Sequence, residues 1–259
     1  VIGEIKNGET YISYPVFMGK TYSYNNIEIG EMYDLSRILT QNGNPYGFDE
    51  TIDSHLIKNS EWGAITYLAH SEYGRNGTKV SINNMDVSEV MDKAKTVTGY
   101  AGKTISSVTN IIEEIDTELR DSYNDKSYAW YTEIGKLGST TGNLYGIYDM
   151  NGASSEYIAG YIDAIDEEKG MMYAKSMVEN RISTKYYTVY KSAVGEENSN
   201  STNENYEANK NIYGDAIVET SQKGSGYTAW FGETSVYIKD DAGFFLRSGG
   251  YDRVNYSGL

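Results

Sequence analysis

The fold of this chain is decided by the stretch GNLYGIYDMNGASSEY, residues 142–157. Turn-forming residues open it at Gly142-Asn143 and reverse the chain again at Asn151-Gly152, with a strand-like apolar run between the two turns. Two carboxylates, Asp149 and Glu156, bracket the second turn. Oxygen ligands around a short glycine-containing loop suit Ca²⁺. Spacing alone favours the simpler interpretation, a surface turn that carries two solvated acids.

The same stretch resembles the central signature of the formylglycine-generating enzyme (sulfatase-modifying factor) family. That family reads Gly-Leu-Tyr-Asp-Met, followed by Gly-Asn-Val-Trp-Glu-Trp. Here Gly146 to Met150, Gly152, Glu156 and the aromatic Tyr157 match, whereas residues 153–155 (Ala-Ser-Ser) replace the family's Asn-Val-Trp. The resemblance implies the family's variant of the C-type lectin-like fold. We therefore expect an α+β fold with a twisted antiparallel sheet, few helices and long loops.

In that family the segment binds a structural Ca²⁺. Carried over position by position, the resemblance implies four ligands in this chain. They are the side chain of Asp149, the backbone oxygens of Gly152 and Ser154, and the carboxylate of Glu156.

Two weaker landmarks support the resemblance. Leu56, Glu61 and Trp62 agree with the family's Leu-Pro-Thr-Glu-Ala-Glu-Trp helix opening, and Arg247 begins a late Arg-Gly-Gly-like turn that Ser248 interrupts. The family's closing Gly-Phe-Arg strand is not found before the chain stops. We expect residues 1–259 to form a single domain cut from a longer chain, with a strand edge open to pairing.

Composition excludes several classes of partner and chemistry. The net charge of −15 argues against binding to nucleic acid or to anionic membrane surfaces. The chain contains no cysteine, so it has no disulfides and no thiol chemistry. No run of about 18 apolar residues is present to insert into a membrane. The 26 tyrosines, with few prolines, suit twisted sheet and irregular loops.

Periodicity predicts several elements along the chain. Alternation over residues 1–24 predicts a hairpin that turns at 6–9. Helical spacing predicts a helix at 31–40, with Met32, Leu35 and Leu39 on its apolar face. A second helix is predicted at 54–70, capped by Ser54 or Asn59, with Trp62, Ile65 and Ala69 on its buried face.

Two further segments are predicted from spacing and composition. We expect residues of about 86–127 to be a helical insertion, since Val108, Ile111 and Ile115 lie at helical spacing. Residues of about 191–211 offer almost nothing to bury, which predicts an exposed polar loop.

The enzyme chemistries of the family do not fit this sequence. The formylglycine-generating enzymes use copper held by two cysteines, and a related branch uses iron held by three histidines. This chain has no cysteine, and its two histidines, His55 and His70, are not spaced as a helical metal pair. Neither histidine accompanies a serine nucleophile elbow, and no phosphate-binding lysine loop is present. We therefore expect a protein that is not an enzyme.

The interpretation that remains is an extracellular binding module, of an adhesin-like or receptor-binding kind. The C-terminal segment is rich in Tyr, Asn, Ser and Gly, as paratopes are, and it is similar to the variable segment of retroelement-diversified proteins. An ordinary polar loop fits that segment equally well. The expected ligand-binding residues are Arg247, Tyr251, Asp252, Arg253, Asn255 and Tyr256.

The expected partner is a protein or glycan on another cell or surface, and the expected location is a bacterial cell surface, the extracellular space or a virion surface. Two alternatives stay open. One is a structural subunit of a pilus-like or virion assembly. The other is an enzyme of the wider superfamily with an atypical site.

Overall fold

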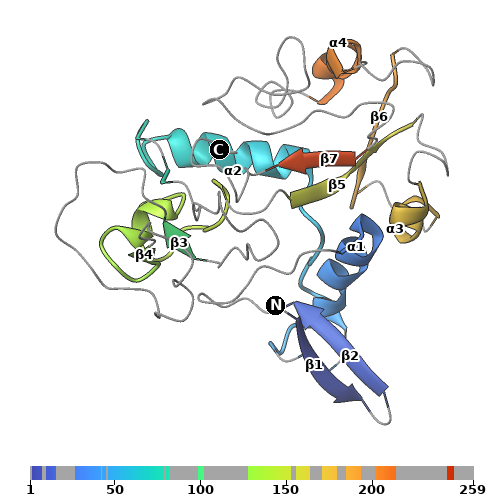
Figure 1. The fold of residues 1–259 in the computed structure, drawn as a ribbon, viewed down its shortest axis with the longest axis horizontal. Helices are drawn as coiled ribbons and strands as arrows, with labels where there is room; N and C mark the ends of the chain where they lie inside the picture. Colours follow the sequence, from blue (N-terminus) through green and yellow to red (C-terminus); the bar gives the residue numbers. More distant parts are fainter. Residues whose placement is uncertain are drawn as a thin grey trace, which may run out of the picture.

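The computed structural model describes residues 2–7, 10–15, 27–41, 43–44, 46–78, 80–81, 99–101, 128–152, 156–163, 171–179, 185–193, 202–213 and 244–247. Over these residues the protein is a mixed α+β structure with short helices, a small three-stranded sheet and long loops (Figure 1). This confirms the predicted α+β class with few helices and long loops, whereas the C-type lectin-like fold itself stays a prediction. No helix within the described residues has the length and apolar character needed to cross a bilayer.

The N-terminal segment forms the predicted hairpin. β1 (Ile2–Asn7) pairs antiparallel with β2 (Thr10–Pro15), and the register runs from Ile2 opposite Pro15 to Asn7 opposite Thr10. Figure 1 shows this hairpin beside α1 at one end of the molecule, where β2 contacts the helix. The Tyr46 hydroxyl donates a hydrogen bond to the Pro15 carbonyl oxygen at 3.0 Å, which ties the end of β2 to the next loop.

Helix α1 (Ile29–Arg37) buries the side that carries Ile29, Gly30 and Tyr33. Gly30 decides how closely this side can approach its neighbour, because a Cβ there would lie 3.0 Å from the Tyr173 carbonyl oxygen. A larger side chain would push the helix away, so the glycine selects the buried side.

The predicted apolar face of this helix was therefore wrong in its register. Met32 and Leu35 are only half-buried, and Leu39 is buried from the 3₁₀ turn η1 (Ile38–Thr40) that follows the helix. The helix also begins and ends slightly earlier than the predicted 31–40.

Helix α2 (Asn59–His70) confirms the second predicted helix, with a later start than residue 54. Trp62, Thr66 and Ala69 are buried, and Ile65 packs against the core at its edge. Lys58, rather than Ser54 or Asn59, occupies the N-cap position.

The central sheet has the strand order β6-β5-β7, from Thr188–Tyr190, Glu156–Ile162 and Phe244–Arg247 respectively. β5 pairs parallel with β6 and antiparallel with β7. The sheet is thus mixed, and the expectation of an antiparallel sheet holds for β5 with β7 but was wrong for β5 with β6.

Strand β5 is buried continuously from Ile158 to Ile162. Such a run is typical of a strand covered on both faces. At Gly160 a Cβ would lie 2.9 Å from the ring of Tyr190, so the glycine makes room for that ring on the neighbouring strand. The backbone N–H of Ala159 donates to the Ile57 carbonyl oxygen at 2.8 Å and joins β5 to the segment that leads into α2.

The largest fully buried side chains of the core come from α1, α2, the sheet and helix α3 (Lys175–Glu179). They include Trp62, Tyr33, Tyr190, Ile29, Ile158, Ile162 and Met177.

The exposed loop predicted at about 191–211 is, from Thr202 onward, helix α4 (Thr202–Tyr213). Two asparagines four residues apart explain the difference. Asn205 accepts a hydrogen bond from the backbone N–H of Ala193 at 2.8 Å, and Asn209 both accepts from and donates to the backbone of Lys191 at 2.9 and 2.8 Å. Both amides are fully buried, so polar groups contribute to the docking of this helix.

The predicted insertion at about 86–127 lies almost entirely outside the described residues. Its described part includes β3 (Tyr100–Ala101), which pairs antiparallel with β4 (Tyr128–Ala129). The remaining short elements are the 3₁₀ turns η4 (Gly135–Gly138) and η5 (Met171–Ala174).

Candidate functional site

The turn that precedes β5 is held in a specific conformation. Asp149 has a φ of 65° and Gly152 a φ of 84°, so both lie in the left-handed region. Aspartate tolerates this region better than most residues, and glycine enters it without strain. Two left-handed residues within four positions bend the chain sharply at this point.

Hydrogen bonds from both sides fix this turn. The backbone N–H of Gly99 donates to the two carboxylate oxygens of Asp149, at 3.1 and 3.2 Å. On the other side, the buried amide of Asn151 donates to the Val80 carbonyl oxygen at 2.6 Å. The Asp149 carboxylate is therefore placed by contacts outside its own turn.

The second predicted carboxylate, Glu156, is electrostatically coupled to the first. Desolvation of its carboxylate, and then repulsion by the charge of Asp149, raise the pKa of Glu156 to about 8 from its ordinary 4.5. As a residue Glu156 remains exposed at the start of β5, so water screens part of this repulsion. The charge of Asp149 thus acts on Glu156 across the turn, after desolvation as the larger cause of the raised pKa of Glu156.

This arrangement fits a hard cation such as Ca²⁺. A cation between Asp149 and Glu156 would relieve their repulsion and favour the ionised form of both. The two side chains would supply carboxylate oxygens, and the bend at Gly152 turns the backbone at the position where the resemblance implies a carbonyl ligand. The fourth implied ligand, Ser154, lies outside the described residues. Among the described residues, no group of three or more Asp, Glu, His or Cys side chains could hold a metal ion, so such a site depends on backbone oxygens.

The structure buries Arg247, which the sequence placed in a ligand-binding surface. Its side chain is 1% exposed, and its Nε and Nη2 atoms both donate to the Oδ1 atom of Asn59, at 2.8 and 2.6 Å. The guanidinium thus joins β7 to the first turn of α2 inside the protein. The other predicted ligand-binding residues, Tyr251, Asp252, Arg253, Asn255 and Tyr256, lie outside the described residues.

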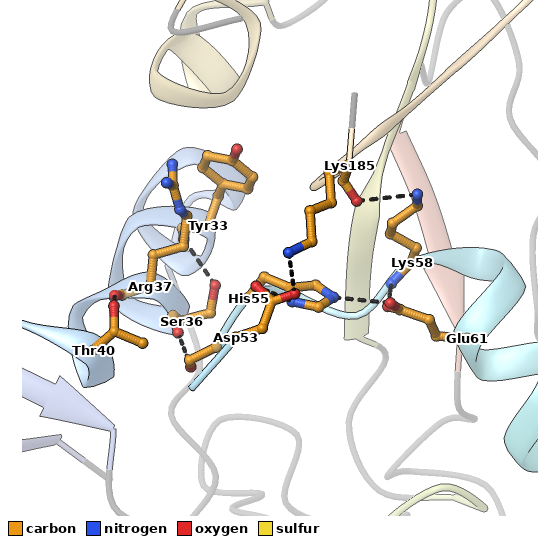
Figure 2. A network of polar contacts seen from close by, with 10 residues as sticks. Tyr33, Ser36, Arg37, Thr40, Asp53, His55, Lys58, Glu61 and Lys185 are labelled. Atoms are coloured by element: carbon orange, nitrogen blue, oxygen red, sulfur yellow. Dashed lines mark hydrogen bonds and ion pairs between the residues drawn. The ribbon is translucent and has the colours of Figure 1, made fainter. Parts of the chain in front are cut away.

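A polar network around His55 was not predicted (Figure 2). His55 lies between two carboxylates: its Nε2 atom is 2.9 Å from Glu61 Oε1, and its Nδ1 atom is 3.5 Å from Asp53 Oδ1. Glu61 also accepts a hydrogen bond from the backbone N–H of Lys58 at 2.8 Å, which caps the start of α2.

Lys185 closes the network from the far side (Figure 2). Its Nζ atom lies 2.7 Å from Asp53 Oδ2, and its carbonyl oxygen accepts a hydrogen bond from Lys58 Nζ at 3.1 Å. The hydrogen bond with Lys185 lowers the pKa of Asp53, and the same bond raises the pKa of Lys185. The only available sequence signal was Glu61, three residues after the helix cap. Nothing local indicates that Lys185 reaches the same cluster.

Comparisons with known proteins add no further assignment, because no protein-family model, no curated protein and no solved structure matches the chain. The relation to the sulfatase-modifying factor family therefore stays a prediction from the residues quoted above.

Proposed function

We propose that this protein is a non-catalytic binding module on a C-type lectin-like scaffold, and that Ca²⁺ bound at residues 149–156 stabilises the scaffold. The observation that carries the proposal is the left-handed turn at Asp149 and Gly152 before Glu156, and the contribution of the Asp149 charge to the raised pKa of Glu156 supports it. The left-handed backbone at Asp149 and its contact with Gly99 supply the preorganised turn.

The ligand count of this site favours a location outside the cell. Ca²⁺ affinity rises with the number of charged ligands, and extracellular modules bind with Kd values of roughly 10⁻⁴ to 10⁻³ M. A site with two carboxylates belongs to this weak class, because backbone oxygens would supply its remaining ligands. Millimolar Ca²⁺ would load it at a bacterial cell or virion surface. There the module would bind a protein or glycan on another cell or surface.

Composition supports a role in binding rather than catalysis. The chain has no cysteine, which removes the copper ligands of the related oxidases, and only two histidines, one fewer than the iron-dependent branch uses. The abundance of tyrosine supplies rigid amphipathic contact groups.

A thermal melt with excess Ca²⁺ and then with chelator tests the ion site. Ligand at about ten times its Kd should stabilise the folded state by about 1.4 kcal/mol through mass action. Asp149→Asn and Glu156→Gln should each abolish this response. The matched control is Glu72→Gln, which removes an exposed carboxylate from the turn after α2 and should leave the response intact.

Mg²⁺ provides a second control. It demands tighter octahedral geometry than Ca²⁺ and gives up its water reluctantly, so it should stabilise the protein less at equal concentration. If the wild type melts at the same temperature with Ca²⁺ and with chelator, the Ca²⁺ proposal is wrong. A Ca²⁺ response that survives both Asp149→Asn and Glu156→Gln would place the ion elsewhere.

A further inference from the structure

A groove of about 710 Å³ runs beside α1, away from the turn at 149–156. One wall is the exposed side of α1, and the other comes from residues 50–54, with Met172, Tyr173 and Tyr186 completing the lining. Its volume lies within the range of ligand pockets in proteins.

Five carboxylates line this groove, together with apolar and aromatic residues and Arg37. Glu31 and Asp34 lie three positions apart on one side of α1, and Glu28 is the N-cap residue directly before the helix. The opposite side, with Ile29 and Tyr33, is buried in the core. The facing wall adds two further carboxylates, from Glu50 and Asp53.

Two cations, Arg37 and Lys185, interact with residues that line the groove. The Arg37 guanidinium lies 4.7 Å from the centre of the Tyr186 ring and 5.6 Å from that of Tyr33. Lys185 is paired with Asp53 at 2.7 Å, as Figure 2 shows. Five carboxylates outnumber these two cations, so the groove carries a net negative charge that attracts cations.

Three carboxylates of the groove take part in none of the ion pairs found among the described residues: Glu28, Asp34 and Glu50.

The spacing of the carboxylates indicates which kind of cation fits. The described residues contain no group of three or more metal-ligating side chains, so the groove carboxylates are too dispersed to surround one ion. They match several cations carried by one extended chain. Met172 and Tyr173, which are 59% and 49% exposed, offer apolar and aromatic surface to the stems of lysine or arginine side chains.

We propose that this groove binds a basic peptide segment, with lysine or arginine side chains of the partner directed at the carboxylates of α1 and of residues 50–54. The inference rests on the proposed binding function but not on the Ca²⁺ site. It names a protein partner with a positively charged segment as the ligand class.

The test is fluorescence anisotropy with a labelled short oligolysine peptide at low ionic strength, in the presence of chelator. Chelator keeps this assay separate from the Ca²⁺ assay, so that either proposal can fail alone. The groove variant combines Glu28→Gln, Asp34→Asn and Glu50→Gln. The control variant combines Glu72→Gln, Glu133→Gln and Glu207→Gln. The three control carboxylates are exposed and lie outside the groove, and both variants lose the same charge.

We expect the groove variant to bind oligolysine about tenfold more weakly than the wild type, whereas the control variant should change the Kd by less than about twofold. A neutral Gly-Ser peptide of the same length should not bind. Equal weakening in both variants would show attraction to the net charge alone and would overturn the proposal. Absence of oligolysine binding to the wild type would overturn it as well.

A single substitution tests the proposal even if the triple variant does not fold. Asp34→Asn changes one exposed carboxylate on the solvent side of α1. It should keep the wild-type circular dichroism spectrum and weaken oligolysine binding by about two- to threefold. Unchanged affinity in this folded variant would also count against the groove.

Discussion

Replacing Asn59 by alanine should destabilise the protein far more than an ordinary polar substitution. The Asn59 Oδ1 atom accepts two hydrogen bonds from the Arg247 guanidinium, at 2.8 and 2.6 Å, and both residues are 1% exposed. Hydrogen bonds to a charged group contribute about 1.5–3 kcal/mol each, and Asn59→Ala removes two of them. We therefore expect Asn59→Ala to lower the free energy of unfolding by about 3–5 kcal/mol.

Helix propensity acts in the opposite direction at this position. Asn59 is the first residue of α2, and alanine is the better helix former, so the loss cannot come from the helix itself. Ser60→Ala, at the exposed neighbouring position, is the matched control and should change the stability by less than about 0.5 kcal/mol.

The assay is urea denaturation followed by tryptophan fluorescence, to which the buried Trp62 contributes. A double-mutant cycle with Asn59→Ala and Arg247→Met isolates the contact from the other interactions of each residue. We expect a coupling energy of at least about 1.5 kcal/mol. If the two substitutions are additive within about 0.5 kcal/mol, the contact does not hold β7 to α2 and this reasoning is refuted.

Two further predictions follow from groups described above. Without Ca²⁺, the free energy of unfolding should fall as the pH rises from 4.5 toward 8, because folded Glu156 keeps a proton that the unfolded chain releases. Above that range the free energy of unfolding should level off. Urea titrations at several pH values should show this slope, and Glu156→Gln should flatten it. Asn209→Ala should lower the free energy of unfolding by about 1–3 kcal/mol in the same assay, because the backbone N–H of Lys191 loses its acceptor. Asn211→Ala, at an exposed position, should stay within about 0.5 kcal/mol of the wild type. An equal loss of stability in both variants would contradict the docking role of Asn209.

The parts of the fold that were predictable from the sequence are those with strong local signals. Alternation identified the hairpin of β1 and β2, and the apolar spacing at Trp62 and Ala69 identified α2. Neither signal depends on a distant part of the chain.

The parts that failed depend on distant partners. Helix α4 was predicted as a loop because two side chains that it buries, Asn205 and Asn209, are polar, and the backbone they bind lies 12 and 18 residues away. The buried side of α1 was misplaced because a close approach at Gly30, not hydrophobicity alone, selects it. The parallel pairing of β5 with β6 has no local signature at all.

The candidate site shows the same division. The turn with Asp149 and Glu156 was visible as a motif, because its residues are neighbours in the sequence. The burial of Arg247 was not visible in the sequence, because it depends on a hydrogen bond to Asn59, which is distant in the chain. The network that links His55 to Lys185 through Asp53 was not predicted either, because Lys185 is distant from the other two in the sequence.

The contact between Asn59 and Arg247 also sets an order of events during synthesis. The two residues are 188 positions apart, so α2 leaves the ribosome long before its partner strand exists. At about 5–20 residues per second, the delay is roughly 10–40 s. During that interval the polar first turn of α2 has no guanidinium to bind, and the central sheet lacks β7. Until then the nascent chain lacks part of its core, and the pairing of β5 with β7 can form only after residue 247 has been made.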